Sequence, residues 1–214
     1  MARRVADQKH GGVRVTAFGR LNKSILNRAN QQTMLLRGTL TRALMAGFLE
    51  GGRRLSVGRN VALVVYGEIA FGDDVTLADG CALEVGPNGR LVLGDNSFVG
   101  RHSVIRAERS IEIGSRCIIA EHCTVRDQDH LVDPDERRHE KAAQTAPIVL
   151  ERDVWIGAGV RVLKGVRVGE GTVVAANAVV RGEVPPGVVV GGIPARILRS
   201  ARVAARGVDF SNPP

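Results

Sequence analysis

The chain has 214 residues and a formal net charge of +8, and aromatic residues make up only 3% of it. No apolar run reaches the ~18 residues that cross a bilayer, and residues 1–21 lack the apolar stretch of a secretory signal. We therefore expect a cytoplasmic location without stable membrane insertion. The sequence contains no basic patch interleaved with aromatic residues, so nucleic-acid binding is not indicated. We interpret the charge as a solvated basic surface, which also favours anionic substrates.

Residues 23–49 have the periodicity of an amphipathic helix. Arg37 and Arg42 lie between apolar residues at helical spacing, which are Leu36, Leu40, Leu44 and Phe48 or Met45. The predicted role of this helix is to cover the open first coil of the repeats that follow. Binding to a membrane surface is the second interpretation.

Most of the remaining chain repeats every six residues. From Leu150 to Pro185 the units are LERDVW, IGAGVR, VLKGVR, VGEGTV, VAANAV and VRGEVP. A fifth position and the next opener are two residues apart, so both side chains lie on the same face of a strand. A six-residue period does not keep one face of a helix, and it is typical of a parallel β-helix. We predict an all-β solenoid.

The earlier units show the same pattern with insertions. The over-long units open at Leu63, Leu83, Ile105 and Val125, and three units lie between successive insertions. Three units per coil predict a triangular prism with every insertion on one edge. The long break from Asp127 to Pro147 leaves from that edge, and loops of this length are usually functional or mobile.

The three cysteines, Cys81, Cys117 and Cys123, all fall at fifth positions. We expect them to be reduced core residues without a disulfide or metal.

Three segments follow from these patterns. Residues 1–54 form a helical or irregular capping segment, and residues 55–192 form the β-helix with the loop 127–147. Residues 193–214 contain a short basic helix over Pro194–Gly207 and a tail.

The stretch from Leu150 to Arg199 resembles the hexapeptide-repeat acyltransferases, which fold as left-handed parallel β-helices. The resemblance is carried by VWIGAGVRVLKGVRVGEGTVVAANAVV (Val154–Val180) and by the exit segment VPPGVVVGGIPARILR (Val184–Arg199). It is closest to the branch that acetylates sugars, including galactoside, maltose and colanic-acid-type O-acetyltransferases. The resemblance implies a homotrimer that moves an acyl group from acetyl-CoA to a saccharide hydroxyl, with one histidine as general base between neighbouring prisms.

Three histidines are candidates for that base. His102 and His122 occupy the fourth positions of units one coil apart, so we expect their rings to stack about 4.8 Å apart. His130 follows Asp127 and Asp129 where the repeat breaks. Asp129 would be a buried fifth position if the repeat continued, so the chain must leave the prism there. In the sugar-acetylating branch a catalytic histidine lies at the mouth of this loop, which favours His130.

A neutral imidazole, with an ordinary pKa of about 6.5, can accept the proton of an attacking alcohol. Asp127 or Asp129 would fix its tautomer. The alternative is that His130 is an ordinary loop residue and that His122 or His102 is the base.

The resemblance also implies a coenzyme site. The positions that match the family's pantetheine groove are Gly157, Ala158, Ala175 and Ala176. Trp155 is an outward sixth position and would line the groove or pack at a subunit interface. The phosphate candidates are Lys164, Arg181, Arg196 and Arg199.

Other functions remain open. Acetylation of an amine on an amino sugar, sugar nucleotide or antibiotic is the first alternative. A zinc enzyme of the carbonic anhydrase type on the same β-helix needs three histidine ligands, and Asp127 stands five residues after His122 where relatives have a second histidine. We expect no metal. The third alternative is a scaffold β-helix without catalysis.

Overall fold

The computed structural model describes residues 31–41, 49–50, 52–129 and 144–201. The chain divides into two compact units, residues 1–33 and residues 34–214. Only residues 31–33 of the first unit are described. They begin a helix that spans residues 31–41.

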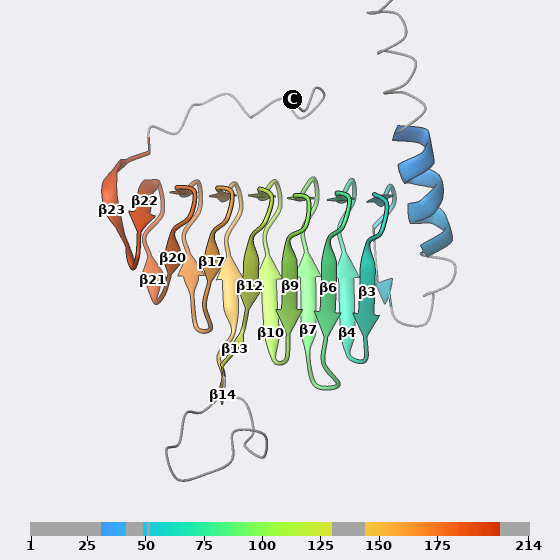
Figure 1. Cartoon of the computed structure of the whole chain (residues 1–214), viewed down its shortest axis with the longest axis horizontal. Coiled ribbons are helices and arrows are strands. Elements are labelled where there is room, and N and C mark those ends of the chain that lie inside the picture. The colour runs from blue at the N-terminus through green and yellow to red at the C-terminus, as the bar shows by residue number, and fades with distance from the viewer. Residues whose placement is uncertain (1–30, 42–48, 51, 130–143, 202–214) are drawn as a thin grey trace, which may run out of the picture. The chain divides into compact units, whose positions relative to one another are not determined.

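The second unit is built from three sheets of short strands (Figure 1). The first sheet contains β1 (Leu49–Glu50), β4 (Glu68–Phe71), β7 (Arg90–Leu93), β10 (Ser110–Ile113), β15 (Ile148–Leu150), β18 (Arg167–Val168) and β21 (Glu183–Val184). The second contains β2 (Ser56–Val57), β5 (Thr76–Leu77), β8 (Phe98–Val99), β11 (Ile118–Ile119), β16 (Trp155–Ile156), β19 (Val173–Val174), β22 (Val188–Gly192) and β23 (Ala195–Ser200). The third contains β3 (Ala62–Val65), β6 (Ala82–Val85), β9 (Val104–Ala107), β12 (Thr124–Arg126), β17 (Arg161–Val162) and β20 (Val179–Val180).

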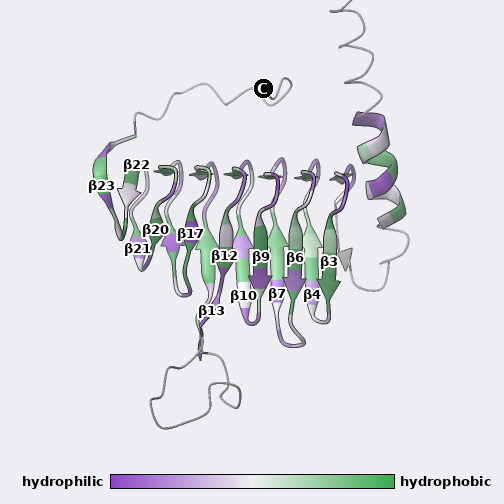
Figure 2. Ribbon diagram, in the orientation of Figure 1, coloured by the Kyte–Doolittle hydropathy of each residue, from purple (hydrophilic) through white to green (hydrophobic). Residues whose placement is uncertain are grey.

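Successive strands of the chain belong to successive sheets, so the backbone winds as a parallel β-helix with three faces. Openers stack on openers in register: Ile119 pairs with Val99 on one side and with Ile156 on the other. Their side chains form a buried core of aliphatic residues, as the six-residue pattern predicted. Figure 2 shows that the strands carry both hydrophobic and hydrophilic residues, which fits one face turned inward and one outward. The repeat fits the left-handed form of this fold.

Two of the prism's corners carry most of the predicted site residues. We call the turns from the second to the third sheet the histidine corner; its turns are 58–61, 78–81, 100–103, 120–123, 157–160 and 175–178. We call the turns from the third to the first sheet the loop corner; it contains residues 66–67, 86–89, 108–109, 127–147, 163–166 and 181–182. The predicted insertions all lie at the loop corner, which confirms that they share one edge.

The three cysteines are core residues, as predicted. Cys81, Cys117 and Cys123 are buried and free. Burial raises the pKa of the Cys81 and Cys117 thiols to about 11, and it also raises the pKa of Cys123. Their side chains are therefore neutral at physiological pH, like small apolar residues.

The predicted C-terminal helix is wrong for the residues that the structure describes. Ala195–Ser200 is strand β23, which pairs antiparallel with β22. The free edge of β22 offers backbone hydrogen-bonding groups, and pairing satisfies them where an isolated short helix would not. Residues 202–207 of that prediction lie outside the described residues.

The N-terminal helix is confirmed over residues 31–41. The predicted helical residues 23–30 and 42–48 lie outside the described part. Leu49, the last residue of the predicted helix, belongs instead to strand β1 (Leu49–Glu50), which pairs with β4. The first sheet therefore starts before the expected boundary at residue 55, because the first coil needs a strand beneath Ile69 and Ala70.

Candidate active site

Asp127 is the buried polar group at the point where the long loop leaves the prism. It is fully buried, and its Oδ1 accepts the backbone N–H of Glu108 at 2.8 Å. Its Oδ2 accepts the N–H groups of Arg109 at 2.7 Å and Ser110 at 2.8 Å. Three backbone donors of the preceding coil therefore satisfy this carboxylate, which offsets the cost of removing it from water.

The inward position therefore belongs to Asp127, whereas Asp129 is exposed, as expected for a chain that leaves the prism there. Arg126 pairs with Arg106, which places Asp127 level with the buried Ala107 of the coil before. The four-residue strands of the third sheet bury alternate residues, as in β6 and β9. The long coils thus carry their second inward side chain two residues after the opener, because the strand continues past it.

A short antiparallel stem begins the loop. β13 (Gln128–Asp129) pairs with β14 (Gln144–Thr145), and both project from the row of coils (Figure 1). The backbone N–H of Ala146 donates to the Asp127 carbonyl at 2.9 Å, so the loop returns where it left. His130 lies just outside the described residues.

Lys164 of the next coil contacts this stem. Its Nζ lies 3.4 Å from Gln144 Oε1 and 3.9 Å from Asp129 Oδ2. The backbone N–H of Gly165 donates to the Ala146 carbonyl at 3.1 Å. Lys164 is therefore part of the loop base, whereas its predicted role is a coenzyme phosphate contact. Gln144, its nearer partner, lies in the break and carries no repeat signal by which the sequence would reveal it.

The histidine corner holds the other two candidate bases. The rings of His102 and His122 stack with centroids 5.4 Å apart and an interplanar angle of 17°, which confirms the predicted stacking. Both residues are exposed and adopt the left-handed conformation, with φ of 55° and 58°. Arg161 donates to the His122 carbonyl at 2.8 Å and so ties this turn to the next coil. Sequence reasoning missed Arg161, which reads as one more outward arginine.

The predicted pantetheine positions lie at the same corner. Gly157 and Ala158 stand one coil above His122, and Ala175 and Ala176 one coil further. A Cβ on Gly157 would lie 2.8 Å from both Val174 O and Ala176 N, so the coil itself requires glycine there. Ala176 is exposed and leaves backbone accessible to a ligand.

The remaining predicted contacts lie on two faces. Trp155 is 51% exposed on the outer face of the second sheet, between Ile118 and Val173, as its phase predicted. Arg196 and Arg199 are exposed on β23, which extends that sheet. Arg181 is exposed at the loop corner, after β20.

The structure thus brings Asp127, Asp129 and Lys164 together at one corner and the small residues together with His102 and His122 at another. Within the described residues, no group of three or more His, Cys, Asp or Glu side chains is arranged to hold a metal ion.

Known families match this arrangement. The profile described as bacterial transferase hexapeptide (six repeats) matches residues 147–182, and that described as hexapeptide repeat of succinyl-transferase matches residues 90–120. The fold and the repeats define a hexapeptide-repeat transferase.

Individual relatives support the same family assignment. WbbJ of Escherichia coli strain K12, named as a lipopolysaccharide biosynthesis O-acetyl transferase, is 33% identical over 145 residues, which cover 62% of this chain and 72% of that protein. A hexapeptide-repeat acetyltransferase from Vibrio cholerae, solved with acetyl coenzyme A, is 27% identical with a TM-score of 0.53 and covers 87% of this chain and 91% of its own. A tetrahydropyridine-dicarboxylate N-acetyltransferase of Staphylococcus aureus is 50% identical over 56 residues, 26% of this chain and 23% of that protein. This chain belongs to the hexapeptide-repeat acyltransferases.

Proposed function

We propose that the protein transfers an acetyl group from acetyl-CoA to a hydroxyl of a sugar or sugar-containing acceptor. The observation that carries the proposal is the similarity to WbbJ, a protein named for O-acetyl transfer, of which this chain covers 72%. The acetyl coenzyme A bound to the Vibrio relative supports the choice of donor. The charges of the exposed Asp129 and the half-buried Lys164 at the loop base suit a polar acceptor.

The reaction is a direct acyl transfer. The acceptor oxygen attacks the thioester carbon while a histidine takes the hydroxyl proton, and a tetrahedral intermediate forms. The intermediate then expels the coenzyme A thiolate, which takes up the proton. We propose His130 as this base, because it directly follows a stem that Asp127 and Lys164 hold in place.

The carboxylate that orients the base is Asp129 in this proposal. Asp127 already accepts three backbone hydrogen bonds, whereas the side chain of Asp129 is 73% exposed and lies 3.9 Å from Nζ of Lys164 in the next coil. Asp127 therefore supports the reaction by holding the loop, and Asp129 is free to contact an imidazole.

We propose that the complete site needs a second copy of the chain, in a homotrimer. The pantetheine positions and the loop base lie at different corners of one prism. A coenzyme arm at Ala158 and Ala176 would meet the loop of a neighbour whose loop corner packs beside it. The exposed Trp155 and the arginines of β23 border the same histidine corner and would flank the coenzyme there.

The acceptor class is tested by coenzyme A release from acetyl-CoA in the presence of saccharides, sugar nucleotides and aminoglycosides. Turnover with neutral saccharides, and an ester in the product, supports the proposal. Turnover restricted to amino sugars or aminoglycosides would instead establish N-acetylation. Absence of coenzyme A binding at millimolar concentration would identify a non-catalytic scaffold.

The base is tested by paired variants. We expect His130→Ala to lower kcat by about 10²–10⁴-fold without changing the oligomeric state. The matched variant is His122→Asn, since asparagine tolerates the left-handed conformation of that turn. Full activity of His130→Ala together with an inactive His122→Asn would assign the base to the histidine corner.

A further inference from the structure

Two leucines are exposed on one face of the helix over residues 31–41. Leu36 is 70% exposed and Leu40 is 59% exposed. Residues four apart on a helix are neighbours on its surface, so the two side chains form one apolar patch. We call this pair the leucine face.

The opposite side of the helix is the one that packs on the prism. Gly38 is buried, and a Cβ added there would lie 1.8 Å from the Leu55 carbonyl oxygen. At 3.6 residues per turn, Gly38 lies about 200° around the axis from both Leu36 and Leu40. The leucine face therefore points away from the β-helix.

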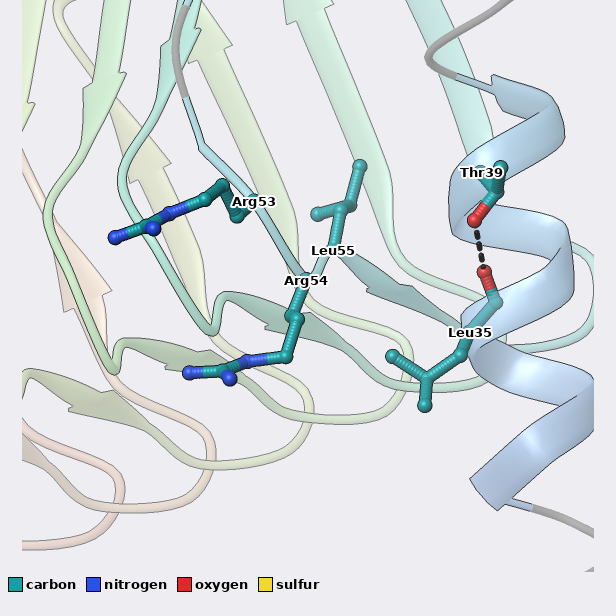
Figure 3. A pocket seen from close by; sticks show the side chains of 5 residues that line it. All are labelled: Leu35, Thr39, Arg53, Arg54 and Leu55. Atoms are coloured by element: carbon teal, nitrogen blue, oxygen red, sulfur yellow. Dashed lines mark hydrogen bonds between the residues drawn. The ribbon is translucent and has the colours of Figure 1, made fainter.

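Capping of the first coil does not account for these leucines. A cavity of about 400 Å³ remains between the helix and the coil, lined by Leu35, Thr39, Arg53, Arg54 and Leu55. Figure 3 shows both arginine side chains pointing away from the helix. Arg53 pairs with Asp73 and Arg54 with Asp74, so the next coil already neutralises them. The cavity is therefore no free anion site.

The excess charge of the protein lies in the segment that contains this helix. Residues 1–41 contain eight Lys and Arg residues and a single Asp, out of 30 basic and 22 acidic residues in the whole chain. Residues 42–214 are therefore almost neutral. A basic segment that ends in a helix with exposed leucines combines the two features that bind anionic bilayers: apolar side chains and many cations.

We propose that the leucine face binds the surface of an anionic lipid bilayer. Leu36 and Leu40 would enter the boundary between headgroups and acyl chains, and the cations of residues 1–41 would be attracted to the lipid phosphates. Within the described residues no helix is long and apolar enough to span a bilayer. The proposal does not depend on the acyl-transfer chemistry.

The experiment is co-sedimentation of the full chain with vesicles. One set contains equal parts of phosphatidylglycerol and phosphatidylcholine, and the other contains phosphatidylcholine alone. We expect binding to the first set only, weakened by added salt. The double variant Leu36→Gln/Leu40→Gln should lower the partition coefficient at least about tenfold, since both apolar contacts are lost.

The matched control is Leu163→Gln, which changes an exposed leucine of the loop corner and should bind vesicles like the unchanged chain. Circular dichroism and sedimentation velocity without lipid show whether fold and oligomeric state are kept. Binding that persists in the double variant would overturn the proposal, because charge alone would then explain it. So would equal binding to the two vesicle sets, or a double variant that changes the oligomeric state.

Discussion

Asp127 and Ser110 are joined across one coil, because Asp127 Oδ2 accepts the Ser110 backbone N–H at 2.8 Å. Ser110 begins β10 of the first sheet, and Asp127 ends the run of the third sheet one coil later. The bond therefore closes the loop corner at the place where the long loop departs. Asp127, which the sequence suggests as a partner of the catalytic base, therefore anchors the base of the long loop.

Asp127→Asn should destabilise the protein by about 1–3 kcal/mol. The amide nitrogen would face a backbone donor and leave it without an acceptor. Thermal unfolding at fixed protein concentration measures the change. Asp129→Asn is the control, with a change below about 0.5 kcal/mol expected for an exposed position. Equal effects of the two substitutions would contradict the assigned roles.

Lys164→Gln should loosen the loop stem without weakening coenzyme binding. The substitution removes the positive charge that faces Asp129. The new glutamine side chain is also shorter than lysine, so its amide lies farther from Gln144. We expect faster hydrogen exchange at the Ala146 and Gly165 amides, which close the loop base. Arg181→Gln, at the same corner, should leave those amides unchanged. A rise in the Kd for coenzyme A with unchanged exchange would restore Lys164 as a phosphate contact.

The effect of a substitution at His122 on stability should depend mainly on whether the new residue tolerates the left-handed backbone conformation. Its φ of 58° is costly for a β-branched side chain. His122→Val should lower stability by about 1–2 kcal/mol. His122→Gly should be neutral or better, since glycine adopts this conformation freely. Chemical denaturation of both variants tests this, and similar midpoints for the two would refute it.

Stability should decline in alkaline solution between about pH 9 and pH 11. Burial raises the pKa of Cys81 and Cys117 from 9.0 to about 11. Between these values the unfolded chain releases the thiol protons while the folded chain retains them, so the free energy of unfolding falls as pH rises. A Cys81→Ala/Cys117→Ala variant should show a shallower fall in thermal midpoint over this range. An equally steep fall would locate the effect elsewhere.

Some contacts of the candidate site could not be predicted from the sequence, for physical reasons. The repeat placed Trp155 outward and the two histidines one above the other, because those directions follow from local phase. It did not reveal that Asp127 points inward, since a strand that runs on past its opener leaves no mark in the six-residue pattern. It missed the contact between Lys164 and Gln144, which joins residues 20 apart.

The sequence by itself determined the three-sided β-helix, the buried cysteines and the single edge that carries every insertion. Each of these depends on side-chain alternation within one unit, which is a local property of the chain. Only the tertiary structure decided that Asp127 belongs to the loop base, that Lys164 binds the stem and that Ala195–Ser200 is a strand. Those outcomes depend on which hydrogen-bonding groups a neighbouring coil leaves unpaired, and that is settled only when the coils are stacked.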